Sequence, residues 1–81
     1  MLKEKIIEII QSFCAVDEEV TYDSELGLLS LDSLSFVELM VTIEEEFGIE
    51  FEFDEINIAS WNTVGDLVNK VEEKFNAEKE N

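Results

Sequence analysis

Apolar residues recur at helical spacing in three separate stretches of this 81-residue chain. The first stretch runs from Leu2 to about Ala15, the second from Ser33 to Phe47, and the third starts behind Thr63. Thr63 with Asp66 resembles a capping box at the start of this third stretch. Spacings of three and four residues place these side chains on one face of a helix. The sequence therefore predicts an all-α fold, a small four-helix bundle with three main helices and one short helix.

Turn-forming and polar residues separate the predicted helices. A long loop covers residues 16–32, and we expect Leu26, Leu28 and Leu29 to pin it to the core. Gly48 is a natural stop for the second helix. Residues 49–54 alternate apolar and acidic but have no partner strand, so we interpret them as an extended connector. The short helix or turn lies near residues 56–61, where we predict that Trp61 is an anchor between the last two helices. Residues 76–81 form a polar, frayed tail. We expect one small domain over residues 1–81.

The charge excludes several classes of function. Acidic residues outnumber lysines 21 to 5, the formal net charge is −16, and the chain has no His. A surface of this sign repels nucleic acid and anionic membranes, so partners are expected to be basic. Without His the chain lacks the usual general base and the commonest metal ligand. We expect a cytoplasmic monomer without a leader peptide, a membrane-inserted segment or a metal site.

Cys14 is the single cysteine of the chain and cannot form an internal disulfide. It lies in the apolar pattern of the first predicted helix. We therefore predict a small buried apolar side chain rather than a reactive thiol.

The second helix carries two apolar faces. At about 100° per residue, its core side chains fall between about 140° and 240° when Leu34 is placed at zero. Aliphatic and acidic side chains share the opposite side, which suits a partner with apolar pockets ringed by Lys or Arg. On the pattern alone, single exposed apolar residues on a solvated surface explain this side of the helix equally well. The predicted docking face consists of Leu34, Val37, Glu38, Val41, Glu44 and Glu45.

Ser33 opens the second helix directly after the long loop. Asp32 is a plausible N-cap, because its carboxylate can accept hydrogen bonds from the first turn. Ser33 is not a hydrolase nucleophile, since the chain has no His to deprotonate it and no Gly-x-Ser-x-Gly elbow. A phosphoester at Ser33 would meet the free N–H groups of a helix N-terminus, although the Asp32 carboxylate opposes it.

The stretch from Leu26 to Leu39, LGLLSLDSLSFVEL, resembles the attachment region of the acyl carrier proteins. Its continuation, EEEFGI at residues 44–49, matches their second helix. The resemblance implies that Ser33 receives 4′-phosphopantetheine from coenzyme A through a dedicated transferase, and that Asp32 contributes to transferase recognition. It also implies that acyl groups travel as thioesters on the arm, and that basic synthase enzymes dock on the second helix.

Three departures from the common family pattern bear on the cargo. Ser35 stands where many fatty-acid carriers have an acid, and the connector 49–54 lacks the Pro often found there. Residues 57–64 resemble D-alanine carriers more than housekeeping carriers. The resemblance therefore implies an acyl carrier for fatty-acid, polyketide or related synthesis, with an aminoacyl carrier loaded by an adenylating ligase as the alternative.

Other classes of protein fit less well. No stretch has the ligand order of an EF-hand loop. An acidic module that blocks a basic protein would explain the charge, but not a serine at the head of the predicted docking helix. The abundant carboxylates are better interpreted as a solvated surface than as an acid/base pair, so we do not expect an enzyme.

Overall fold

The computed structural model describes residues 2–80, with side chains described up to Ala77. The described residues form three α-helices and three single-turn 3-10 helices, without a β-strand. In chain order they are α1 (Leu2–Ser12), η1 (Leu26–Leu28), α2 (Ser33–Phe47), η2 (Phe53–Glu55), η3 (Ile58–Ser60) and α3 (Val64–Glu80). The predicted all-α bundle is confirmed.

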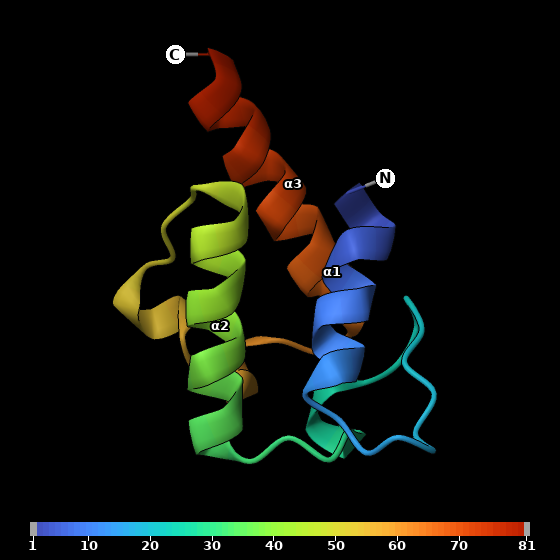
Figure 1. Ribbon diagram of the computed structural model, residues 1–81. Helices are drawn as coiled ribbons and strands as arrows, with labels where there is room; N and C mark the ends of the chain where they lie inside the picture. The colour runs from blue at the N-terminus through green and yellow to red at the C-terminus, as the bar shows by residue number, and fades with distance from the viewer. Residues whose placement is uncertain (1, 81) are drawn as a thin grey trace.

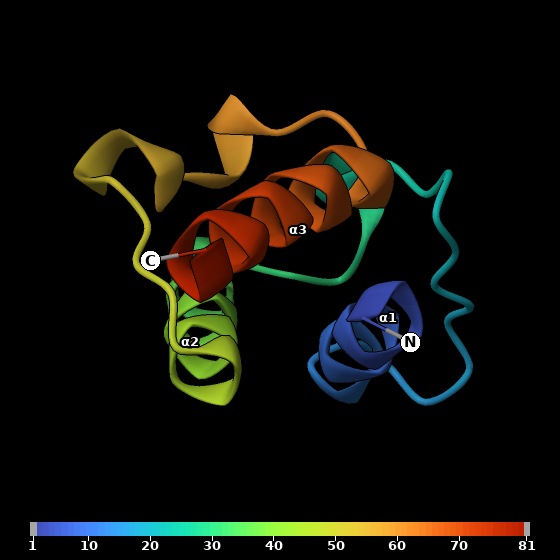
Figure 2. The same cartoon turned by 90° about the horizontal axis from the view of Figure 1, so that it is seen from above.

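The three α-helices surround one core. Figure 1 shows α1 and α2 running in opposite directions, and Figure 2 shows α3 lying obliquely across one side of that pair. Each helix buries one face, as its apolar spacing predicts. The fully buried large side chains are Ile6, Ile10, Leu26, Phe36, Leu39, Met40, Ile43, Val64, Leu67, Val68 and Val71.

The helix ends differ from the sequence prediction at two points. α1 ends at Ser12 rather than near Ala15. The amide of Gln11 explains the early end, because it donates to the Glu18 carbonyl and accepts from the Val20 N–H, which turns the chain away from the helix axis. α3 continues to Glu80, although a frayed tail was predicted from residue 76. Asn81, the last residue of that tail, lies outside the described residues.

The capping predictions are confirmed. The Asp32 side chain accepts from the Ser35 N–H at the start of α2, and Gly48 ends the helix with a left-handed φ of 66°. At the start of α3, the Thr63 N–H donates to Asp66 at 3.1 Å, and the Asp66 N–H donates to the Thr63 hydroxyl at 3.2 Å. These bonds satisfy backbone groups that a helix end leaves without partners.

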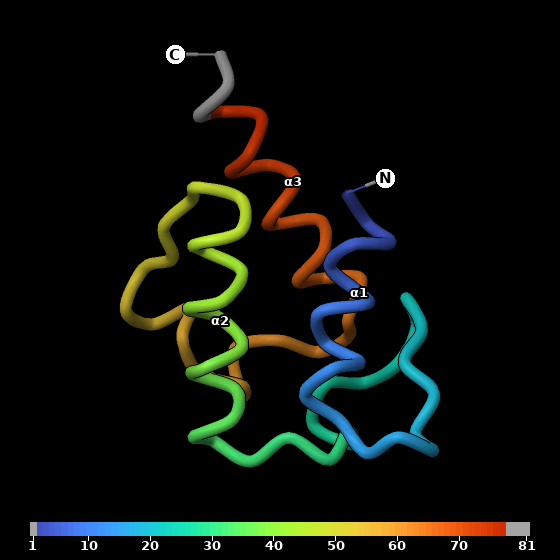
Figure 3. The backbone as a smooth tube through the Cα atoms, viewed as in Figure 1, coloured from blue at the N-terminus to red at the C-terminus, as the bar shows by residue number. Residues whose placement is uncertain are grey.

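The predicted short helix is divided into η2 and η3, which lie on the connector between α2 and α3. Figure 3 shows this connector descending along the outer side of α2 and then passing behind it to reach α3. Asn57 separates the two turns, because its side chain accepts from the Ala59 N–H and starts η3. The connector therefore forms a wall beside α2.

The long loop after α1 is held by backbone and side-chain contacts. The Leu26 side chain is fully buried and anchors η1, whereas Leu28 is 77% exposed, although we predicted that it would help to pin the loop. The Val64 N–H donates to the Ser24 carbonyl at 2.8 Å, and the Gly65 N–H to the Tyr22 carbonyl at the same distance. The loop is thus attached to the start of α3.

Candidate functional site

Ser33 is the first residue of α2 and its side chain is exposed. Asp32 precedes it in extended conformation, and its carboxylate accepts from the Ser35 N–H at 2.7 Å. This hydrogen bond lowers the pKa of the Asp32 carboxyl. The cap fixes the first turn of the helix, so the Ser33 hydroxyl is presented on an ordered backbone.

The loop that leads into Ser33 is braced by Glu18. The Glu18 carboxylate accepts from both the N–H and the hydroxyl of Ser30, and the Ser30 hydroxyl accepts from the Ala15 N–H at 3.1 Å. Hydrogen bonding from the Ser30 hydroxyl, and then from its N–H, lowers the pKa of Glu18. Next to this brace, the Leu31 side chain is buried and anchors the chain just before Asp32.

Most of the predicted docking face is exposed on α2. Leu34 is 69% exposed, and Val37 and Val41 are also exposed large apolar side chains. Glu38 and Glu45 are exposed next to them on the same side of the helix. The structure therefore brings three aliphatic and two acidic side chains together on the side of α2 that faces away from the core.

Glu44 differs from the rest of the predicted face. It is half-buried, and its carboxylate accepts from the backbone N–H of Phe51 at 2.8 Å. This bond attaches the connector to α2. Glu44 thus lies at the edge of the exposed face, between α2 and the connector.

A pocket of about 740 Å³ lies between α2 and the connector. Ser33, Phe36 and Val37 line it from α2, and the segment from Phe53 to Ser60 lines it from the other side. The polar side chains at its border are those of Ser33, Asp54, Asn57 and Ser60, while the remaining lining is apolar. A group attached to Ser33 therefore has a sheltered apolar space directly beside it.

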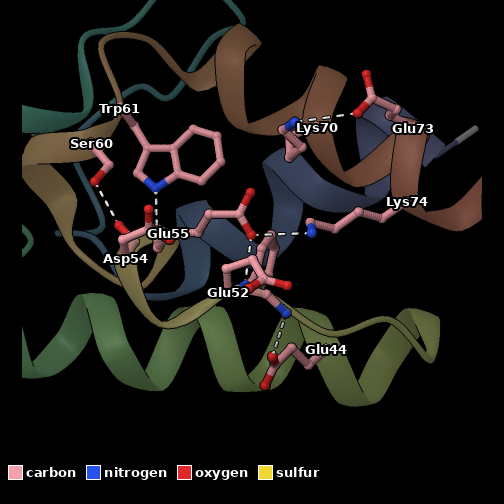
Figure 4. Close-up of polar contacts among 10 residues, drawn as sticks. Glu44, Glu52, Asp54, Glu55, Ser60, Trp61, Lys70, Glu73 and Lys74 are labelled. Atoms are coloured by element: carbon pink, nitrogen blue, oxygen red, sulfur yellow. Dashed lines mark hydrogen bonds and ion pairs between the residues drawn. The ribbon is translucent and has the colours of Figure 1, made fainter.

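Figure 4 shows the polar contacts that hold the connector. The Lys74 ammonium lies 3.1 Å from the Glu55 carboxylate, and that carboxylate also accepts from the Glu52 N–H at 2.7 Å. Partial burial raises the pKa of Glu55, but these hydrogen bonds and the nearby lysines outweigh it, so the pKa is lowered. The Trp61 indole donates to the Glu55 carbonyl at 2.8 Å.

Trp61 is half-buried and packs edge-on against Phe51, with ring centroids 6.4 Å apart. The prediction that Trp61 is an anchor is consistent with these contacts. The sequence pattern did not predict the pocket wall, above all Phe53 and Asp54. Their only signal was the apolar–acidic alternation of residues 49–54, which does not reveal which side chains face α2.

Cys14 is half-buried rather than buried. Burial, together with the charge of Glu18 and a hydrogen bond to it, raises the pKa of the thiol to about 11. The predicted absence of a reactive thiol agrees with this environment, because the thiolate is the reactive form.

Neither a metal centre nor a membrane-spanning helix was identified in the described part of the chain. Among residues 2–77, the His, Cys, Asp and Glu side chains do not form a group of three or more that could hold a metal ion. None of the described helices has the length and apolar character needed to cross a membrane.

The site meets the two requirements for a long covalently attached arm. The Ser33 hydroxyl is accessible, and the adjoining pocket is open to it. The positive end of the α2 dipole suits a phosphate at that position. The residues present therefore fit 4′-phosphopantetheine.

Comparisons with known proteins agree with this geometry. Residues 4–71 match the family model described as the phosphopantetheine attachment site. The chain is 41% identical over 81 residues to an acyl carrier protein of Petrotoga mobilis. This alignment covers 98% of the chain and 93% of the relative. It is 38% identical over 74 residues to a D-alanyl carrier protein of Leuconostoc mesenteroides, which covers 88% and 92%.

A third relative, an acyl carrier protein of Streptococcus thermophilus, is 43% identical over 72 residues, which cover 88% of this chain and 92% of the relative. No solved structure matches the chain significantly. The family model and these relatives each extend over most of the chain, and the family consists of carriers that bear 4′-phosphopantetheine rather than of catalysts. The chain belongs to the acyl carrier protein family.

Proposed function

We propose that Ser33 is the residue to which 4′-phosphopantetheine is attached. The observation that carries this proposal is the position of an exposed serine at the N-terminus of α2, beside the pocket between α2 and the connector. The Ser33 oxygen would form the new phosphoester bond and give up its proton, while the pyrophosphate bond of coenzyme A breaks and adenosine 3′,5′-bisphosphate leaves. Because the chain has no His, the base that accepts this proton is supplied by the transferase.

The protein's own residues present the arm. Asp32 caps α2, and the Glu18–Ser30 brace holds the loop before it, so the attachment point has a defined direction. When attached, the arm supplies a terminal thiol that holds the cargo as a thioester. The carrier contributes position and recognition, while catalysis belongs to the enzymes that visit it.

The exposed side of α2 is the proposed docking surface for those enzymes. Leu34, Val37 and Val41 provide apolar contacts, and Glu38 and Glu45 surround them with negative charge. The net charge of −16 attracts a basic partner from a distance and favours rapid association. Glu44 contributes mainly by attaching the connector, since its carboxylate accepts from the Phe51 N–H.

The cargo we propose is an acyl group of fatty-acid, polyketide or related synthesis. The apolar lining of the pocket supports this choice, because an apolar chain attached through Ser33 can leave water there. A D-alanyl group is the alternative, favoured by the relative in Leuconostoc mesenteroides that bears that name. A panel of acids offered with ATP and adenylating ligases to the arm-bearing protein separates the two.

The experiment that tests attachment is an intact-mass measurement. The protein is incubated with coenzyme A, Mg²⁺ and a broad-specificity phosphopantetheinyl transferase, with Ser33→Ala in parallel and helicity of both checked by circular dichroism. We expect one phosphopantetheine on the wild type and none on the variant. A wild type that stays unmodified would leave Ser33 as only the first residue of α2 and favour an acidic interaction module. A modified Ser33→Ala would place the arm elsewhere.

The remaining expectations stay predictions. They are a monomeric single domain over residues 1–81, a cytoplasmic location, and the absence of catalytic activity of its own.

A further inference from the structure

Phe53 is an aromatic side chain that the fold leaves almost entirely in water. It is 94% exposed, whereas Phe36 and Phe51 are buried. It belongs to η2 and stands between two exposed acidic residues, Glu52 and Asp54. An exposed apolar side chain edged with charge has the composition of a contact in a protein–protein interface.

The backbone holds Phe53 in this exposed position. η2 has a capping box, in which Glu52 and Glu55 bond each other's backbone N–H groups, and the Glu55 carboxylate is further held by Lys74. The same network, drawn in Figure 4, includes the indole of Trp61 bonded to the Glu55 carbonyl. A side chain carried on an ordered turn needs little further ordering when it binds a partner.

Phe53 is also continuous with the site already described. It lines the same pocket as Ser33 and Val37, on the opposite side from α2. An enzyme that brings a phosphate to the Ser33 hydroxyl must approach the mouth of this pocket. The contact surface of such an enzyme therefore reaches Phe53 as well as the exposed side of α2.

We propose that Phe53 is a second apolar anchor for the transferase that modifies Ser33, separate from the docking surface on α2. The partner surface that fits it is an apolar cavity bordered by Lys or Arg, because acidic residues flank Phe53 and the chain carries a net charge of −16. This inference rests on the proposed function of Ser33. It goes beyond that function because it assigns part of the recognition by the transferase to the connector between α2 and α3.

The test uses a background in which no arm can form. Ser33→Ala protein competes with wild-type protein for the broad-specificity phosphopantetheinyl transferase, and the inhibition constant measures docking alone. Adding Phe53→Ala is expected to weaken inhibition by about tenfold, which corresponds to about 1.4 kcal/mol. Phe53→Leu, which keeps an apolar side chain, should recover part of the loss.

Val16→Ala, in the same Ser33→Ala background, is the matched control. Val16 is 102% exposed in the loop that follows α1. Figure 2 shows this loop on the other side of the molecule from the connector. It should leave the inhibition constant unchanged. Circular dichroism and thermal unfolding of each variant establish that the fold is retained.

Equal inhibition with and without Phe53→Ala would overturn the proposal, and so would an equal loss with Val16→Ala. No inhibition by Ser33→Ala, although the wild type is modified, would also overturn it. An effect of Phe53→Ala confined to protein that retains Ser33 would also overturn it, because Phe53 would then serve the arm. Failure of the proposed function is distinguishable, since the wild type itself would remain unmodified.

Discussion

The Lys74 ammonium on α3 lies 3.1 Å from the carboxylate of Glu55 on η2, and both side chains are only about one-fifth exposed, at 20% and 19%. The same ammonium lies 5.7 Å from the centre of the Phe51 ring. One cation thus connects α3 to the wall of the pocket beside Ser33. Cations are scarce in this chain, which has five lysines and 21 acidic residues. Removing the Lys74 charge should therefore have a measurable effect.

Lys74→Met should lower the free energy of unfolding by about 1 kcal/mol, since it leaves a partly buried Glu55 carboxylate without its cation. The fluorescence of Trp61, the only tryptophan, should change with it because its indole bonds the Glu55 carbonyl. Denaturant unfolding and native-state emission spectra provide the measurements.

Lys70→Met is the matched control for Lys74→Met. It removes the same charge from α3, but Lys70 pairs with Glu73, whose side chain is 74% exposed. We expect little change in stability or emission. Equal effects of the two substitutions would show that net charge, rather than the contact with Glu55, determines the result.

Gly65→Ala should destabilise the protein by about 1–3 kcal/mol, because overpacking forces neighbouring groups to move. A Cβ at Gly65 would lie 2.6 Å from a carbon of the Tyr22 ring, whose hydroxyl also donates to Asn69. In a Tyr22→Ala background the same substitution should become neutral or stabilising, since Ala is the better helix former. Thermal unfolding of the wild type, the two single variants and the double variant gives the coupling free energy between positions 22 and 65.

Gly27→Ala serves as the comparison for Gly65→Ala. A Cβ at Gly27 meets nothing within 4 Å, so stability should be unchanged or slightly raised. If Gly65→Ala were equally harmless, the close packing of Tyr22 against α3 would be refuted.

Glu18→Gln should reveal a pH-dependent contribution of the brace before Ser33. The pKa of Glu18 is lowered in the folded protein, so its ionised form stabilises the fold above the pKa of an unfolded glutamate, about 4.3. This contribution is lost as the pH falls through the lowered pKa. We expect the melting temperature of Glu18→Gln to lie below that of the wild type at pH 7. The difference between the two melting temperatures should disappear at acidic pH.

Glu19→Gln is the control for Glu18→Gln. Removing any one negative charge from so acidic a chain relieves electrostatic repulsion, and the control measures that effect alone. Glu19 is exposed and neighbours Glu18, so the two variants have the same net charge. The melting-temperature difference between the two variants should shrink as the pH decreases. A difference that stayed constant with pH would mean that the Glu18 carboxylate does not act through its charge.

Glu38→Lys should raise the KM for the transferase by about tenfold at low ionic strength, because it reverses a charge on the proposed docking surface. At 1 M salt, where the Debye length is about 3 Å, most of the effect should disappear. Glu8→Lys on α1 changes the net charge equally on another helix. Equal kinetics for the two variants would remove Glu38 from the docking surface.

Much of the fold could be predicted because local signals and burial agree. Asp32, Gly48 and the Thr63–Asp66 pair stand where the helices begin and end, and the core face of α2 is buried as its spacing predicts. The extra turn of α3 was missed because polarity was interpreted as fraying. Residues 76–80 contain no Gly or Pro that would stop a helix.

The site was only partly predictable for a different reason. A helical projection identifies the exposed face of α2, but it does not show what packs against the edge of that face. Glu44 projects at about 280°, close to Met40 at about 240°, and a half-buried position follows only once the connector lies beside it. The pocket could not be predicted for the same reason, because its outer wall exists only when the positions of η2 and η3 are known.

The environment of Cys14 has a consequence for the safety of the cargo. A thioester is lost when another thiolate attacks it, and the rate of such an exchange depends on the fraction of thiol that is ionised. With a pKa of about 11, Cys14 is almost entirely protonated at neutral pH. A carrier whose own cysteine stays protonated does not compete with its prosthetic thiol for the activated group that it delivers.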